Sequence, residues 1–173
     1  MAPYVVTTPY PITPELLKRG IEHVCYEYSN LISAAHCDLH GQAPWRTHCD
    51  DAFLLGYRKM RDFLIKDKRS SRNGVDLPDI LASDYLPAGF TKTWTLPTWE
   101  TEWQDEMHKQ LAHITFEREK KWEHWKWVPK LEAEMRTAWS EFLAAITEPA
   151  HKTEFTAQNS HCQRKQGFEN VSL

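Results

Sequence analysis

Histidine and arginine side chains gather in one stretch of the sequence, residues 98–130. The stretch holds three of the nine histidines (His108, His113 and His124) and an arginine, Arg118, with five residues between it and His124. RNA cleavage by attack of its own 2′-hydroxyl group needs a base, an acid and a cation that stabilises the phosphorane. Histidine can fill either proton-transfer role, and arginine can hold a phosphate with two parallel hydrogen bonds. We therefore consider His113 as base or acid, with His108 or His124 in the complementary role.

A basic segment lies earlier in the chain, between Arg58 and Arg72. It contains seven lysines or arginines and two aspartates. Such an excess of positive charge can form a phosphate-contacting patch, although a solvated helix end followed by a basic loop has the same composition. Arg58 can hold a phosphate as Arg118 can, or it can pair with Asp62 four residues along a helix.

The same residues also fit a purely structural arrangement. His113 lies between Ala112 and Ile114 and can hydrogen-bond Asp62 or Asp84 across helices. The chain would then be a non-enzymatic bundle that binds a protein partner or a second copy of itself. Exposed tryptophans would anchor the partner, buried ones would fill the core, and a small-molecule pocket lined by them is a third interpretation. The tryptophans concerned are Trp94, Trp99, Trp122, Trp125 and Trp127.

Periodic apolar residues predict the helices that would position these side chains. In residues 98–127, a capping box of Thr101 and Gln104 precedes an apolar stripe, and we expect a bend between Thr115 and Pro129. Intervals of three and four between apolar residues predict the other helices, at 14–35, 50–68 and 129–146, with a short extra one at 78–86. Four principal helices with single apolar stripes predict an all-α fold, an antiparallel bundle.

The chain length of 173 residues fits one domain with a substantial core. We expect an extended N-terminal arm over residues 1–13, the helical domain over 14–148, and a disordered tail over 149–173. The tail is polar and aperiodic, and Pro149 is expected to stop the preceding helix. Trp94, in an irregular bridge over residues 87–97, is available to plug the core.

Composition limits the cellular context and the cofactors. The net charge of −3 argues against non-specific nucleic-acid binding by the whole surface. No apolar run is long enough to cross a membrane, and the first residues do not resemble a signal peptide, so we expect a cytoplasmic protein. Dinucleotide-binding and P-loop motifs are absent, as is the Glu-x-x-His pattern of di-iron bundles, so no cofactor is expected.

The four cysteines have no CxxC spacing, which favours reduced thiols over a disulfide framework. Two of them fall in a predicted connector, residues 36–51, together with three histidines. These five residues, His36, Cys37, His40, His48 and Cys49, could supply the ligands of a structural zinc ion. An ordinary polar loop is the alternative, because the adjacent His48 and Cys49 have poor geometry for one metal, and we predict no metal site.

Three segments of this sequence, in this order, resemble a family of uncharacterised bacterial helical proteins. They are FLLGYRKMRDFL (53–64), LPDILASDYL (77–86) and HKQLAHITFER (108–118). Members carry a helix with Arg and Asp before a Phe, a D-[VI]-L-A-x-D-[YF] segment and an N-K-x-[LI]-A-H-[LI]-T segment. The likeness covers about residues 14–146, and His108 stands where the family usually has asparagine. The matching polar positions are Arg58, Asp62, Asp84, His113, Thr115 and Arg118.

A looser similarity extends to HEPN domains, small helical bundles that often act as metal-independent ribonucleases in bacterial defence and toxin systems. Their motif is Arg, four to six residues and then His, near a dimer interface. HKQLAH (108–113) aligns with this motif, with His108 in place of the arginine. The resemblance implies an RNA-directed homodimer, possible endoribonuclease activity and two sets of site residues. The catalytic set is His113, Arg118, His108 and His124, and the substrate-binding set is Arg58, Asp62, Asp84 and Thr115.

Overall fold

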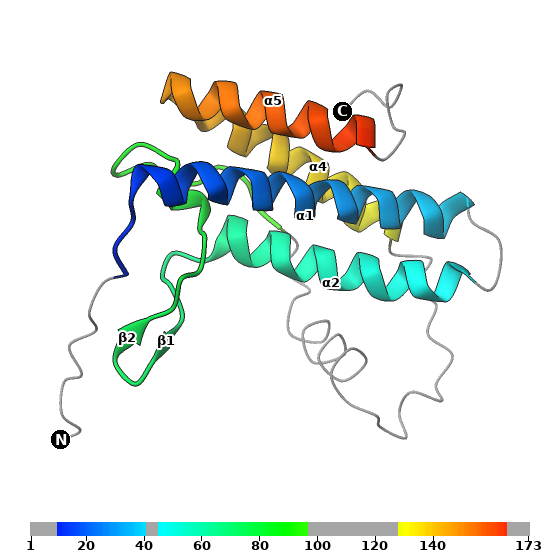
Figure 1. Ribbon diagram of the computed structural model, residues 1–173. Coiled ribbons are helices and arrows are strands. Elements are labelled where there is room, and N and C mark those ends of the chain that lie inside the picture. The colour runs from blue at the N-terminus through cyan, green and yellow to red at the C-terminus, as the bar shows by residue number, and fades with distance from the viewer. Residues whose placement is uncertain (1–9, 41–44, 97–127, 166–173) are drawn as a thin grey trace.

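The computed structural model describes residues 10–40, 45–96 and 128–165, and most of these residues are helical (Figure 1). The helices are α1 (Pro14–His40), α2 (Trp45–Ile65), α4 (Val128–Ala145) and α5 (Pro149–Lys165). Between α2 and α4 lie a two-stranded hairpin, β1 (Ser71–Arg72) and β2 (Val75–Asp76), and a short 3-10 helix, η1 (Ala82–Asp84). The predicted helical class is therefore confirmed. None of the described helices is long and apolar enough to cross a membrane.

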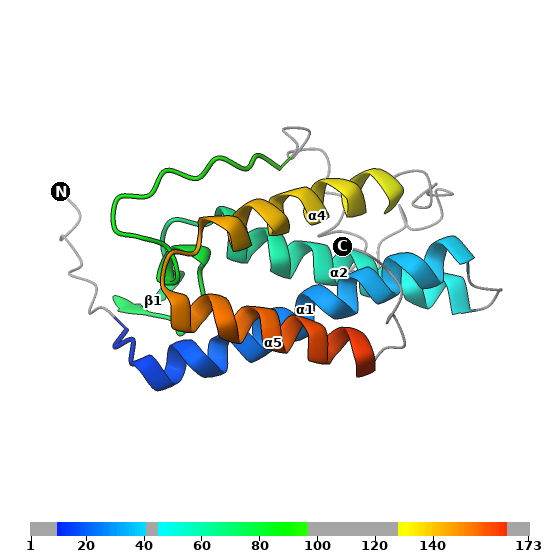
Figure 2. The same ribbon diagram turned by 90° about the horizontal axis from the view of Figure 1, so that it is seen from above.

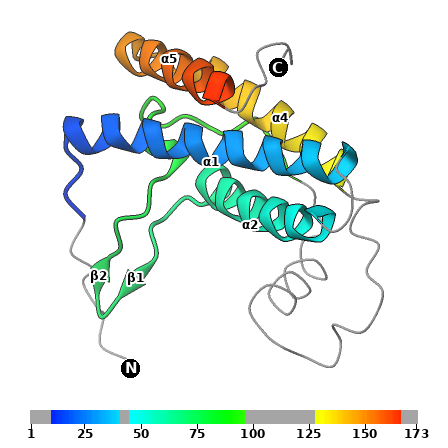
Figure 3. The same cartoon turned by 45° about the vertical axis from the view of Figure 1, so that its right-hand side comes forward.

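α1 and α2 lie side by side along most of their lengths (Figures 1 and 3). Their predicted apolar stripes are buried; Tyr28 and Leu31 of α1 and Phe53 and Met60 of α2 are all less than 5% exposed. Gly56 lies at a close approach of the two helices, since a Cβ atom there would be 3.1 Å from the Cβ of Leu31. This close crossing explains a glycine inside a helix, where it costs about 1 kcal/mol relative to alanine.

The bridge after η1 closes the C-terminal end of α2. Trp94 is buried, as predicted, and its indole N–H donates to the Leu64 carbonyl at 3.2 Å. The ammonium group of Lys92 donates to the carbonyls of Ile65 and Lys66, at 2.9 and 3.0 Å. The last carbonyls of a helix have no partner within the helix, and a cation there is favourable. Two bridge side chains therefore satisfy the end of α2.

α4 packs against both α1 and α2, as its regular apolar stripe predicts. Leu131, Met135 and Phe142 are fully buried. Trp139 stacks on Tyr28 of α1, with ring centroids 4.5 Å apart. The predicted helix over residues 129–146 is confirmed to within one residue at each end.

α5 contradicts the prediction of a disordered tail for residues 149–165, and the rest of that predicted tail, residues 166–173, lies outside the described part of the chain. Pro149 opens this helix instead of only ending the previous one, because proline suits the first helical position. Phe155 is fully buried, with its ring 5.3 Å from that of Phe142, and α5 lies against α1 on the side away from α2 (Figures 1 and 2). The helix has too few apolar residues to show a periodic stripe, so its stability comes from tertiary contacts.

The predicted connector over residues 36–51 is also wrong in extent. α1 continues to His40 and α2 begins at Trp45, so Cys37 and Cys49 face each other across the helix pair and form a disulfide, with Cα atoms 6.0 Å apart. These two cysteines are therefore not reduced thiols and cannot be zinc ligands. Among the described residues, no group of three or more His, Cys, Asp or Glu side chains is arranged to hold a metal ion. Cys25 and Cys162 are buried and belong to no disulfide.

Two local elements differ from the expected short helix and loop. Residues 78–86 form only the single 3-10 turn of η1. Before it, the pairs Ser71–Asp76 and Arg72–Val75 form the hairpin, whose turn residues Asn73 and Gly74 have φ values of 54° and 77°. Positive φ at both positions is typical of the tight turn that asparagine–glycine favours between strands.

Candidate functional site

The residues expected to carry catalysis lie outside the described part of the chain. His108, His113, Thr115, Arg118 and His124 all fall within residues 97–127, and they remain predictions. The other three expected site residues, Arg58, Asp62 and Asp84, are described.

Arg58 and Asp62 lie on α2, but they do not form the expected pair. The Asp62 carboxylate is bound by Lys66 at 2.9 Å and lies 4.0 Å from Arg61. Lys59, in the same basic segment, pairs with Glu27 of α1 at 2.8 Å. Neighbouring carboxylates therefore neutralise part of the positive charge that the sequence places between residues 58 and 72.

Asp84 lies on η1, where it forms the most buried ion pair of the described residues. One carboxylate oxygen accepts a hydrogen bond from Arg69 at 2.6 Å, and the other accepts one from the Leu81 amide at 2.9 Å. The Asp84 side chain is 8% exposed and that of Arg69 is 16% exposed. Breaking a pair buried to this degree would leave an uncompensated charge, so the pair holds η1 against the start of the hairpin.

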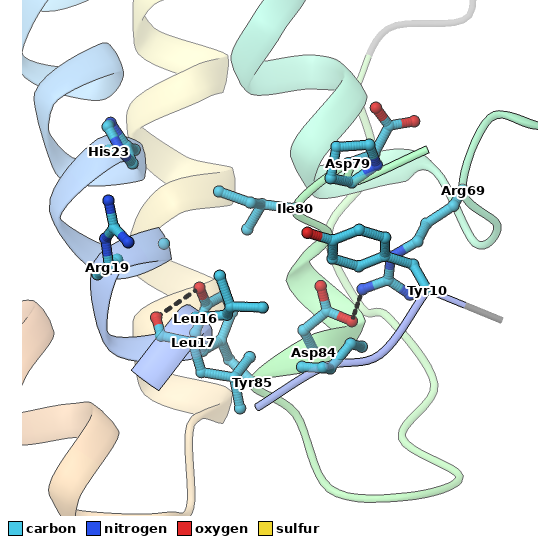
Figure 4. A pocket seen from close by; sticks show the side chains of 13 residues that line it. Tyr10, Leu16, Leu17, Arg19, His23, Arg69, Asp79, Ile80, Asp84 and Tyr85 are labelled. Atoms are coloured by element: carbon cyan, nitrogen blue, oxygen red, sulfur yellow. Dashed lines mark hydrogen bonds and ion pairs between the residues drawn. The ribbon is translucent and has the colours of Figure 1, made fainter. Parts of the chain in front are cut away.

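A pocket of about 230 Å³ opens beside this ion pair, between the first turns of α1 and residues 78–85 (Figure 4). Arg19 and His23, four residues apart on α1, lie on one side of it. The Arg69–Asp84 pair and Tyr10 lie on the other side, and Ile80 lies between them. The pocket thus combines a cationic wall, an aromatic ring and an apolar centre.

The floor of the pocket depends on the contact between Gly20 and Tyr85. The Tyr85 hydroxyl group donates to the Leu17 carbonyl at 3.0 Å, and a Cβ atom at position 20 would collide with that hydroxyl group. Burial, together with the nearby charge of Asp84, raises the pKa of the Tyr85 phenol. Tyr85 is therefore a neutral donor that joins η1 to α1, and only glycine allows this approach.

Asp79 supplies the other carboxylate of the pocket. Partial burial by itself would raise its pKa, but hydrogen bonds from Ser70 and the charges of Lys66 and Arg69 outweigh this and hold the pKa below the usual range. The Ser70 amide donates to the carboxylate at 2.9 Å. Asp79 is therefore ionised at neutral pH and ties the segment before η1 to the start of the hairpin.

Arg19 is the cation of the pocket that no described carboxylate pairs, although the two lining cations (Arg19 and Arg69) and the two lining carboxylates (Asp79 and Asp84) balance in formal charge. Asp84 is matched by Arg69, and Asp79 is engaged by Ser70. No carboxylate among the described residues forms an ion pair with Arg19, which is exposed, as is His23. The wall formed by Arg19 and His23 can therefore bind an anion, and the apolar centre can receive a flat or aliphatic group attached to it.

This pocket was not predicted from the sequence. The sequence feature that could have indicated it is the spacing of Arg19 and His23, which puts both on one helix face away from the apolar stripe. No family model matches this chain, and neither a curated protein nor a solved structure is significantly similar to it.

Proposed function

We propose that this chain is an RNA-directed helical protein similar to HEPN domains and acts as a metal-independent endoribonuclease. The proposal gives His113 the role of base or acid, with His108 or His124 in the complementary role and Arg118 on the phosphate. The substrate-binding residues would be Arg58, Asp62, Asp84 and Thr115. We further propose that the four helices form an antiparallel bundle that presents these residues.

The observation that carries the proposal is the composition of the pocket. A free arginine and a histidine lie across an apolar centre from a tyrosine ring. Proteins that bind single-stranded nucleic acid combine cationic side chains for the backbone with aromatic rings for the bases. The resemblance of residues 108–113 to the HEPN motif supports the reaction class, whereas the resemblance of residues 53–64, 77–86 and 108–118 to a helical family supports only the fold.

A cleavage assay with the purified full-length protein tests this function. Fluorescently labelled single-stranded RNA is incubated with the protein in EDTA, and the products are separated on a denaturing gel. We expect cleavage by the wild type and at least about a 100-fold loss for His113→Ala, since positioned acids and bases contribute about 10²- to 10⁴-fold. His36→Ala, which removes an exposed histidine from α1, is the matched control and should cleave like the wild type. Equal cleavage by both variants would remove His113 from the mechanism, and no cleavage by the wild type would remove the activity.

A non-enzymatic interaction protein is the second candidate. Tyr26 is 54% exposed beside a groove between α1 and α5 that Arg164 also lines. Tyrosine and arginine are enriched in protein–protein interfaces. Sedimentation of the wild type and of Tyr26→Asp tests this second candidate, because a dimer built on this groove should dissociate in the variant. For a non-enzymatic protein, the wild type should also show no RNA cleavage.

A further inference from the structure

The pocket at the start of α1 is too small for a strand of nucleic acid. Its volume is about 230 Å³, below the range of about 300–1,000 Å³ that is typical of small-molecule sites. A terminal group, such as a phosphate with part of its nucleoside, suits this space better than an internal segment of RNA. The end of a strand is therefore the part of an RNA that this pocket fits.

The positions of the cations favour a phosphate monoester. Arg19 and His23 lie one helical turn apart, so both can donate to one group above the helix surface (Figure 4). A terminal phosphate carries up to two negative charges and three free oxygens, which offers more acceptors than an internal diester. The planar guanidinium group of Arg19 can bind two of those oxygens at once, while His23 donates to the third.

The opposite wall provides a surface for the attached nucleoside. Tyr10 is half-buried at the rim, and its hydroxyl group points toward the centre of the pocket in Figure 4. Ile80 and Tyr85 contribute apolar surface between the two walls. A base or ribose joined to the phosphate can pack on these side chains, since aromatic rings accept any base face.

We propose that the pocket formed by Arg19, His23 and Tyr10 binds a nucleotide phosphate monoester, as the phosphorylated end of an RNA strand. This inference rests on the proposed RNA-directed function and names the part of the RNA that the pocket recognises. A free nucleoside monophosphate carries the same chemistry, and the experiment separates the two sources. The motif over residues 108–124 is not needed for this binding.

Fluorescence anisotropy with the full-length protein tests the proposal. The probes are a single-stranded RNA with a 5′-phosphate, the same RNA with a 5′-hydroxyl, the same RNA with a 3′-phosphate, and free adenosine monophosphate as competitor. We expect a phosphorylated end to bind at least about 10-fold more tightly than the hydroxyl end, as for hydrogen bonds to a charged group. Arg19→Ala should remove this preference, and Arg19→Lys should retain only part of it.

Lys18→Ala is the matched control, because it removes one positive charge from the exposed neighbour of Arg19, which does not line the pocket. It should leave the preference for a phosphorylated end unchanged. A wild-type protein without this preference, or an Arg19→Ala variant that keeps it, overturns the proposal. RNA binding that lacks any end preference but supports His113-dependent cleavage would reject the pocket and leave the proposed function intact.

Direct calorimetric titration of adenosine monophosphate, which needs no bound RNA probe, gives the opposite separation. If adenosine monophosphate binds in an Arg19-dependent manner and RNA does not bind, the phosphate site stands with a free nucleotide as its ligand, and the RNA-directed function falls. If neither the RNA probes nor the nucleotide binds, both proposals fall. Thermal unfolding of each variant confirms that the substitutions at these exposed positions leave the fold intact.

Discussion

Replacing Gly20 by alanine should destabilise the protein, although alanine is the better helix former. Inside a helix this exchange ordinarily stabilises by about 1 kcal/mol. Here the new Cβ atom would collide with the Tyr85 hydroxyl group, which must move away from the Leu17 carbonyl. An unsatisfied buried hydroxyl costs about 1–3 kcal/mol, and displacing a packed ring adds about 1–3 kcal/mol. We therefore expect a net loss of roughly 1–5 kcal/mol in the free energy of unfolding.

A second substitution isolates the cause of this loss. Tyr85→Phe alone should cost about 1 kcal/mol, the usual net value of one hydrogen bond. In the Gly20→Ala background the same exchange removes the atom that the new Cβ meets. The double variant should therefore be close to the wild type, because a lost hydrogen bond of about 1 kcal/mol is offset by a helix-propensity gain of about 1 kcal/mol. Tyr85→Phe would thus destabilise the wild type and stabilise the variant.

Urea unfolding followed by circular dichroism measures all four proteins of this cycle. Gly89→Ala provides the control, since Gly89 has a φ value of 77° and a Cβ atom added there would have no other atom within 4 Å. That substitution should be destabilising through backbone strain alone and additive with Tyr85→Phe. A stabilising effect of Gly20→Ala, or an equal effect of Tyr85→Phe in both backgrounds, would show that the two side chains do not collide.

Three further predictions test other parts of the fold. Phe155→Ala should lower the free energy of unfolding by about 3–5 kcal/mol because Phe155 is fully buried, whereas Thr153→Ala, on the exposed face of α5, should change it by less than about 0.5 kcal/mol in the same urea titration. Reducing the Cys37–Cys49 disulfide should cost about 3 kcal/mol, as for a loop closed over 12 residues, and dithiothreitol should lower the Tm of the wild type but not of a double serine variant. Because the pKa of Asp79 is held below its usual range, its stabilising contribution is present above about pH 4 and is lost as the pH falls through the lowered value. Asp79→Asn should therefore be less stable at neutral pH, by under about 1 kcal/mol for this partly exposed group, and should lose less stability on acidification; an unchanged acid profile would contradict this.

The periodic spacing of apolar residues predicted the helices whose buried faces are regular apolar stripes. The stripes of α1, α2 and α4 are dense enough that burial follows from spacing alone, and their predicted residues are buried. The burial of Trp94 was predicted for a different reason, because it is a large aromatic residue in an irregular bridge between helices. α5 lacked such a stripe, because its fit depends on Phe155 entering an aromatic cluster made by Trp139 and Phe142 of α4 and by Tyr85, the residue after η1. No local pattern in residues 149–165 contains that information.

The disulfide was missed because of an error in helix length. Ending α1 at residue 35 puts Cys37 in a loop, where no partner is defined. Extending the helix to His40 and starting α2 at Trp45 leaves four residues between them, which brings Cys37 and Cys49 to the same level of the helix pair. Helix ends are set by capping and tertiary contacts, and these are weaker in sequence than an apolar stripe.

The pocket could not be predicted because its two walls come from distant parts of the chain, and each part has a different pattern in the sequence. Arg19 and His23 share a helix face, which the sequence contains, but Arg69 was counted only as part of a basic segment. Its charge is matched by Asp84, so the unpaired cation at the pocket comes from α1 and not from the segment where positive charge is densest. A charged side chain can recognise a ligand when it has no partner in the fold. Only the contacts between elements distinguish such an unpaired side chain from a paired one. A search for phosphate sites in helical proteins of this kind should therefore start from unpaired arginines beside apolar space, not from the segments richest in basic residues.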